Sequence, residues 1–170
     1  YIGKNPTTKK NSYYVLRFDF SGVSTSSKEE LLYSFNEKTL TGFSNFEEKY
    51  NVKVDYKKEG IPSDVFGLFL NNVTRQISGH IYVMIDEYDH FANELLSFQT
   101  NVFEETVSRV GFVRKWYEVL KSATSGGLVQ RIFVTGVSPV TLDSMTSGFN
   151  IAKNKTRDIL FNPTFGMIGC

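Results

Sequence analysis

The amino-acid sequence predicts an α/β fold in which a parallel β-sheet is flanked by helices. Strand-like and helix-like segments alternate along the 170 residues, a pattern that favours parallel strands joined by helical crossovers. Residues 81–85, IYVMI, form an unbroken apolar run typical of a central strand covered on both faces. Carboxylates follow this run directly, and ligands of such sheets bind at the carboxyl ends of the strands. We therefore expect a single domain over residues 1–170 with its site at that edge.

The composition is that of an ordinary globular protein and excludes several function classes. Nineteen Lys and Arg nearly balance 18 Asp and Glu, leaving a net charge of +1, so the charge does not support nucleic-acid binding. The single cysteine, Cys170, cannot form an internal disulfide, which fits a reducing compartment. The longest apolar runs are about five residues, against about 20 for a membrane span. We expect a soluble, cytoplasmic protein without a membrane partner.

The first half of the chain predicts one strand and one helix. Residues 13–20, YYVLRFDF, alternate between an apolar face and a face with Arg17 and Asp19, so we expect a strand. Ser27, followed three residues later by Glu30, is a capping box that predicts the start of a helix. Gly42 is a weak point in this helix. Its expected buried stripe consists of Leu32, Phe35, Phe43, Phe46 and Tyr50.

From residue 62 onward, the sequence predicts two helices, two strands and a final short helix. Pro62 opens a helix that should end at Gly79, with a stripe of Phe66, Phe69, Val73 and Ile77. After the strand at 81–85, a helix is expected from about 102 to 123. Its inward residues are Phe103, Val107, Val110, Val113, Trp116 or Tyr117, and Leu120. A short strand follows at 131–136, and residues 139–145 begin a short helix.

Two acids stand where the predicted central strand ends. Asp86 and Glu87 follow four or five apolar residues, which is a Walker B pattern. In such a site the strand places the first carboxylate near a magnesium ion and its waters, and the second polarises an attacking water. Acids at a strand end also cap helices or face solvent, so the pattern alone leaves both interpretations open.

The strand predicted at 131–136 brings further polar residues to this edge. We predict that residues 132–134 lie parallel to 81–85, which places Asp86 and Thr135 at the same edge of the sheet. NTPases with a catalytic Glu beside Walker B carry a polar residue at the tip of the neighbouring strand, near the γ-phosphate. Thr135 and Ser138 stand there in "VTGVS". Thr135 can equally be a β-branched strand residue, and Ser138 the cap of a helix.

A metallohydrolase with His90, Asp86 and Asp89 as ligands is an alternative. His80 and His90 bracket the acidic strand, but they are ten residues apart along a strand and a loop. Both could bind one metal only if the chain folded back on itself.

Four stretches together resemble a known family. They are "SYYVLRFDFSG", "IYVMIDEYD", "GFVRKWYEVLKSA" and "IFVTGVSPVTLDSMTSGFNIAKN". The chain resembles the AAA-ATPase-like family of predicted bacterial P-loop ATPases, which often carry a nuclease-like domain at the carboxyl end. The resemblance implies an additional-strand P-loop NTPase fold that binds ATP and Mg²⁺. It also implies that Asp86 is the magnesium-associated acid, Glu87 the water-activating acid, and Thr135 and Ser138 the sensor segment, with Asp89 a companion acid.

One part of the family pattern is absent from the sequence. No GxxxxGK[ST] phosphate loop occurs, and after Gly3-Lys4 the residues Asn5 and Pro6 do not fit one. We expect that the phosphate-loop segment precedes this chain and that the carboxyl end is also truncated. The missing strand would leave open sheet edges that favour self-association.

The missing loop leaves two function classes for the chain. The first is the core of a Mg²⁺-dependent ATPase that is inactive without its phosphate loop. The alternative is a non-catalytic interaction or signalling module that retains the NTPase fold.

Overall fold

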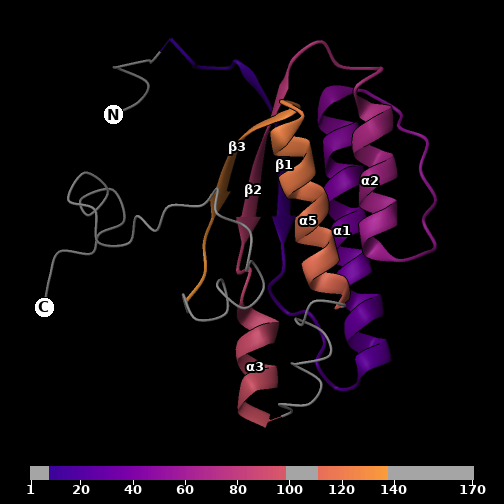
Figure 1. Ribbon diagram of the computed structural model, residues 1–170, viewed down its shortest axis with the longest axis vertical. Coiled ribbons are helices and arrows are strands. Elements are labelled where there is room, and N and C mark those ends of the chain that lie inside the picture. Colours follow the sequence, from indigo (N-terminus) through magenta and orange to yellow (C-terminus); the bar gives the residue numbers. More distant parts are fainter. Residues whose placement is uncertain (1–7, 99–110, 138–170) are drawn as a thin grey trace, which may run out of the picture.

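The computed structural model describes residues 8–98 and 111–137. Strands and helices alternate along the described chain, as the sequence predicts (Figure 1). In chain order they are β1 (Tyr13–Asp19), α1 (Lys28–Tyr50), α2 (Pro62–Val73), β2 (His80–Asp86), α3 (His90–Phe98), α5 (Phe112–Ser125) and β3 (Val129–Val134). No helix in this part of the chain is both long and apolar enough to cross a membrane.

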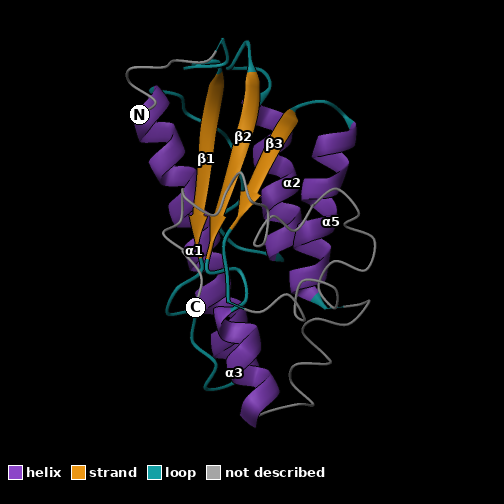
Figure 2. Cartoon of the chain, turned by 90° about the vertical axis from the view of Figure 1, so that its left-hand side faces the viewer, coloured by secondary structure: helices purple, strands orange, loops and turns teal. Residues whose placement is uncertain are grey.

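The described strands form a parallel sheet in the order β1-β2-β3, which confirms the predicted α/β class. β2 is the central strand of the three, as its apolar run predicts. Asp19 is opposite Asp86 in the register of β1 and β2, and Ile85 is opposite Val134 in that of β2 and β3. The carboxyl ends of the strands therefore meet at one edge, where the arrowheads point in Figure 2.

Residues 8–98 and 111–137 cover only one face of β2, so the predicted cover of its second face is not found in this part of the chain. Ile81, Val83 and Ile85 are buried, whereas the alternate residues Tyr82 and Met84 remain half-buried. Figures 1 and 2 show the reason, because α1, α2 and α5 all lie on the same face of the sheet. β1 follows the same rule, with Leu16 and Phe18 buried and Arg17 and Asp19 exposed, as predicted.

Helix α1 begins at the predicted cap. The Glu30 amide donates to the Ser27 hydroxyl at 3.1 Å, and the helix ends at Asn51 in a left-handed conformation. Leu32, predicted to face inward, is 38% exposed, because its neighbour Leu31 occupies the buried face instead. The buried residues of the helix are Leu31, Phe35, Thr39, Gly42, Phe43 and Phe46.

Gly42, the predicted weak point of α1, lies directly against β1. A Cβ atom at this position would stand 2.6 Å from Cδ1 of Phe18 and 2.8 Å from the carbonyl oxygen of Arg17. Real Cβ atoms do not approach other atoms so closely, so glycine allows the close packing of α1 on β1. This contact fixes the backbone of β1 beside the central strand.

Two predicted helix boundaries need correction. α2 ends at Val73, although Ile77 beyond it is buried as expected. α5 begins at Phe112, because Gly111 is extended (φ −67°, ψ 144°), so the helix predicted over 102–123 does not run through this glycine. The part of that prediction between 102 and 110, and the short helix at 139–145, lie outside the described residues. The inward residues of α5 are confirmed: Val113, Trp116, Tyr117 and Leu120.

Helix α3 was not predicted from the sequence. It follows the acids of β2 and extends beyond the carboxyl ends of the strands, as both views show (Figures 1 and 2). Phe91, Ala92 and Leu95 on this helix are buried. The Phe91 ring lies 6.5 Å from that of Phe20 and 5.8 Å from that of Phe35, measured between centroids. α3 is thus anchored in the aromatic core next to the candidate site.

Candidate functional site

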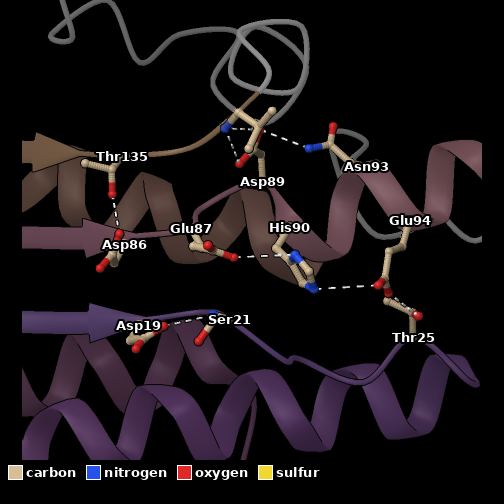
Figure 3. A network of polar contacts seen from close by, with 11 residues as sticks. Asp19, Ser21, Thr25, Asp86, Glu87, Asp89, His90, Asn93, Glu94 and Thr135 are labelled. Carbon is tan, nitrogen blue, oxygen red and sulfur yellow. Dashed lines mark hydrogen bonds and ion pairs between the residues drawn. The ribbon is translucent and has the colours of Figure 1, made fainter. Parts of the chain in front are cut away.

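The carboxyl edge of the sheet gathers the polar residues that the sequence singled out. Asp86 is the last residue of β2, and Thr135 follows the last residue of β3. The Thr135 amide donates to the Ile85 carbonyl at 2.9 Å, so the pairing of the two strands continues to this point. The prediction that Asp86 and Thr135 lie at the same edge is confirmed (Figure 3).

The Asp86 carboxylate is held from both sides. The Thr135 hydroxyl donates to Oδ1 at 2.5 Å, and Nη2 of Arg17 on β1 lies 3.1 Å from Oδ2. The Asp86 side chain is 44% exposed and that of Arg17 is 62% exposed. The Asp86 carboxylate is therefore held in place by two side chains, while its exposed part can still be reached by ions from solvent.

Asp19 supplies a second carboxylate at this edge. It is the register partner of Asp86 on β1, and its Oδ1 accepts the Ser21 amide at 3.0 Å. Hydrogen bonds from the side chain and backbone of Ser21 lower the pKa of Asp19 from its ordinary value of 3.8, with a smaller contribution from the charges of Lys38 and Arg17. Asp19 is thus an anion at neutral pH, and the sequence had placed it only on the polar face of a strand.

Glu87 has an unusual backbone. Its φ of 51° lies in the left-handed region, which costs a non-glycine residue about 1–2 kcal/mol and is concentrated at functional positions. Its Oε2 lies 3.4 Å from Nδ1 of His90, and Figure 3 shows the carboxylate directed toward that ring. The chain leaves β2 at this residue and turns into α3.

His90 connects Glu87 to the loop after β1. Its Nε2 lies 3.6 Å from Oε1 of Glu94, whose Oε2 accepts the Thr25 hydroxyl at 2.8 Å (Figure 3). His90 therefore lies between two carboxylates, and Glu87 is tied through it to α3 and to the segment before α1.

Asp89 is buried, with 1% of its surface exposed. Its two carboxylate oxygens accept the Val137 amide at 3.1 and 3.0 Å, and Oδ2 also accepts Nδ2 of Asn93 at 3.0 Å (Figure 3). Its oxygens thus face the loop after β3 and the first turn of α3.

The predicted metallohydrolase triad of His90, Asp86 and Asp89 is not assembled. Asp89 is turned into hydrogen bonds with the backbone, and His90 faces Glu87 and Glu94. Residues 8–98 and 111–137 contain no group of three or more His, Cys, Asp or Glu side chains that could hold a metal. His80 stands at the other end of β2, where its Nδ1 lies 3.0 Å from the Gly127 carbonyl oxygen.

The comparison with protein families agrees with the resemblance seen in the sequence. A family model described as a predicted AAA-ATPase matches residues 1–146. The chain belongs to the AAA-ATPase-like family. No curated protein and no solved structure matches it.

The structure of this AAA-ATPase-like chain brings together three of the four predicted site residues. Asp86 and Thr135 are in contact, and Glu87 is the next residue in the chain. Ser138 lies outside the described residues. The contacts of Arg17 with Asp86 and of His90 with Glu87 were not predicted, because they depend on which residues meet across strands and turns.

Proposed function

We propose that this AAA-ATPase-like chain carries the magnesium-binding and water-activating side of an ATP-hydrolysing site. The observation that supports the proposal most is the pairing of Asp86 with Thr135 at the carboxyl edge of a parallel sheet. Ligands of open α/β sheets bind at this edge. A strand-end carboxylate in contact with a hydroxyl from the neighbouring strand suits a metal-bound phosphate.

The donors at this edge fit Mg²⁺. The ion prefers hard oxygen ligands, and in nucleotide sites it takes one or two carboxylates together with phosphate oxygens and waters. Asp86 offers a half-exposed carboxylate, with Asp19 opposite it in the register. When bound, Mg²⁺ would neutralise the charge that develops on the phosphate oxygens.

Arg17 is the competitor for Asp86. Its guanidinium lies 3.1 Å from Oδ2, but both side chains are substantially exposed. Exposed ion pairs contribute about 0–1 kcal/mol, so Arg17 can turn away from Asp86 at little cost when a cation arrives.

Glu87 is the proposed general base. Its carboxylate is about half exposed and can reach a water, while His90 at 3.4 Å restricts its orientation. A carboxylate next in sequence to the metal-binding acid is placed to orient a water for in-line attack on the γ-phosphate.

The 170 residues contain no GxxxxGK[ST] motif, so the proposal assigns to them the metal and water side of the site and leaves the phosphate cradle to other residues. β3 is at the edge of the described sheet, beside which a further strand can pair. We propose that this strand comes from the same protein or from a second copy. A nuclease-like domain at the carboxyl end is a further proposal that rests on the family resemblance.

A second candidate is a non-catalytic interaction module that retains the fold. The contacts of both Asp86 oxygens, with Arg17 and Thr135, favour it, because each oxygen already has a protein partner without a metal. A full-length protein that neither binds nor hydrolyses ATP would support this candidate.

The test compares Glu87→Gln with Asp86→Asn in the full-length gene product, by ATP turnover and by calorimetric ATP affinity in Mg²⁺. Glu87→Gln should bind ATP normally but lose about 10²–10⁴-fold in turnover, the usual effect of removing a general base. Asp86→Asn should also weaken Mg²⁺-dependent binding. Glu48→Gln, an exposed acid near the end of α1, is the matched control and should behave as the parent does. Parental turnover in Glu87→Gln would refute the proposal.

A further inference from the structure

Asp89 is a buried acid for which the proposed reaction has no use. The buried polar residues within the described chain are Thr39, Ser63 and Asp89, and of these only Asp89 can carry a charge. Burying a carboxylate is unfavourable unless hydrogen-bond donors replace its lost water. Its donors therefore indicate what the residue does.

The known donors to Asp89 come from two different segments. The Val137 amide reaches both oxygens, at 3.1 and 3.0 Å, and the Asn93 side chain donates to Oδ2 at 3.0 Å (Figure 3). An ionised carboxylate only accepts hydrogen bonds, so it can satisfy both donors at once. Val137, whose amide donates to these oxygens, is two residues after Thr135 and 48 residues after Asp89.

Thr135 is itself fixed by the backbone on both sides. Its amide donates to the Ile85 carbonyl at 2.9 Å, and its carbonyl accepts the Tyr88 amide at 3.2 Å. The segment after β3 therefore runs along the segment after β2 as far as Val137. At Val137 the amide donates to the Asp89 carboxylate and not to a backbone carbonyl of that segment.

Gly136 provides an independent observation of this close approach. A Cβ atom at this position would overlap the Tyr88 ring and Oδ1 of Asp89. The φ of Gly136 is not positive, so its backbone conformation does not require a glycine. A glycine is needed because there is no space for a side chain. The two segments are thus in direct contact at residues 88, 89 and 136.

We propose that Asp89 is a positioning residue that holds the Val137 amide and so directs the Thr135 hydroxyl at Asp86. An acid before a helix ordinarily caps it, and this carboxylate in addition reaches the loop after β3 and Asn93. The contact couples the start of α3 to the tip of β3. This role in catalysis rests on the proposed function, whereas the contact itself does not.

The first experiment measures amide hydrogen exchange by NMR in the 170-residue chain. Asp89→Ala should speed exchange at Val137 by about tenfold or more relative to amides in β1, and Asp89→Asn, which keeps one acceptor, should have an intermediate effect. Gly136→Ala should speed exchange at Val137 as well, and it serves if Asp89→Ala does not fold. Asp64→Asn, an exposed acid in the first turn of α2, is the control. Unchanged exchange at Val137 in the folded Asp89 variants would overturn the proposal.

The second experiment uses ATP turnover in the full-length protein. If Asp89 acts through Thr135, Asp89→Asn should lower kcat by about 10–10²-fold with little change in KM, and it should add no loss in a Thr135→Val background. Losses that multiply in the double variant would overturn the positioning role. If the parent protein hydrolyses no ATP, the proposed function fails, and the exchange experiment then decides alone whether Asp89 holds the loop.

Discussion

Replacing Gly42 by alanine tests how closely α1 packs on β1. The added Cβ would stand 2.6 Å from the Phe18 ring and 2.8 Å from the Arg17 carbonyl oxygen. Neither neighbour can move freely, because one is backbone of the sheet and the other is a fully buried ring. The Phe18 ring contacts those of Phe20, Phe43, Phe66 and Trp116.

Two opposing effects set the magnitude of this change. Alanine within a helix is favoured over glycine by about 0.5–1 kcal/mol. Overpacking a core costs about 1–3 kcal/mol, and the rigid neighbours of Gly42 place it toward the upper end of that range. We therefore expect Gly42→Ala to lower the free energy of unfolding by about 1–2.5 kcal/mol. Gly67→Ala in α2 meets no atom within 4 Å and should instead raise it by about 0.5–1 kcal/mol.

Urea unfolding followed by tryptophan fluorescence is the assay. The single tryptophan, Trp116, is buried, and its ring centroid lies 5.0 Å from that of Phe18, so its emission reports on the packing that the alanine disturbs. The two glycine variants should shift the midpoint in opposite directions. Equal stabilisation by Gly42→Ala and Gly67→Ala would refute the close contact between α1 and β1.

Three further changes test separate features of the structure. Burial, and then the charge and hydrogen bond of Glu47, raise the pKa of Tyr56 from 10.0 to about 12. The free energy of unfolding should therefore fall between pH 10 and about pH 12, because Tyr56 ionises at a lower pH in the unfolded chain. Glu47→Gln should lower the pKa of Tyr56 measured by ring-carbon NMR. An unchanged pKa would contradict the role of Glu47. Ser27→Ala removes the cap of α1 and should cost about 1 kcal/mol in urea unfolding, unlike Ser44→Ala on the exposed face of the same helix. Glu87→Gly should be more stable than Glu87→Ala by about 1 kcal/mol, because glycine adopts the left-handed backbone without strain; equal stabilities would argue against that backbone.

Features with a local chemical cause could be predicted from the sequence. The N-cap at Ser27 and the alternation of β1 depend on neighbours a few residues away, and both are confirmed. The helical stripe was less certain, because a shift of one residue turns a side chain by about 100° around the helix. Leu31 and Leu32 are both apolar, so composition cannot decide between them, and the packing against the sheet selects Leu31.

Features that depend on distant contacts could not be predicted. From the sequence, Gly42 could be interpreted only as a weak point of a helix. Its packing role depends on Phe18, which approaches from another element, β1. Asp86 and Thr135 could be placed at one edge, since parallel strands share their direction. The partners of Asp89 could not be predicted, because Val137 is 48 residues away and is brought near by the hydrogen bonds of Thr135 to Ile85 and Tyr88.

The proposed metal site at Asp86 can be probed by replacing Mg²⁺ with paramagnetic Mn²⁺. Small amounts of Mn²⁺ with ATP are added to the isotope-labelled chain, and the broadening of each amide NMR signal is recorded. If Asp86 binds the ion, the amide signals of Asp86 and Thr135 should broaden first, those of His80 and Val129 at the other end of β2 and β3 should stay sharp, and Asp86→Asn should remove the effect. Broadening that persists in Asp86→Asn, or that centres on the opposite edge of the sheet, would contradict the proposed site.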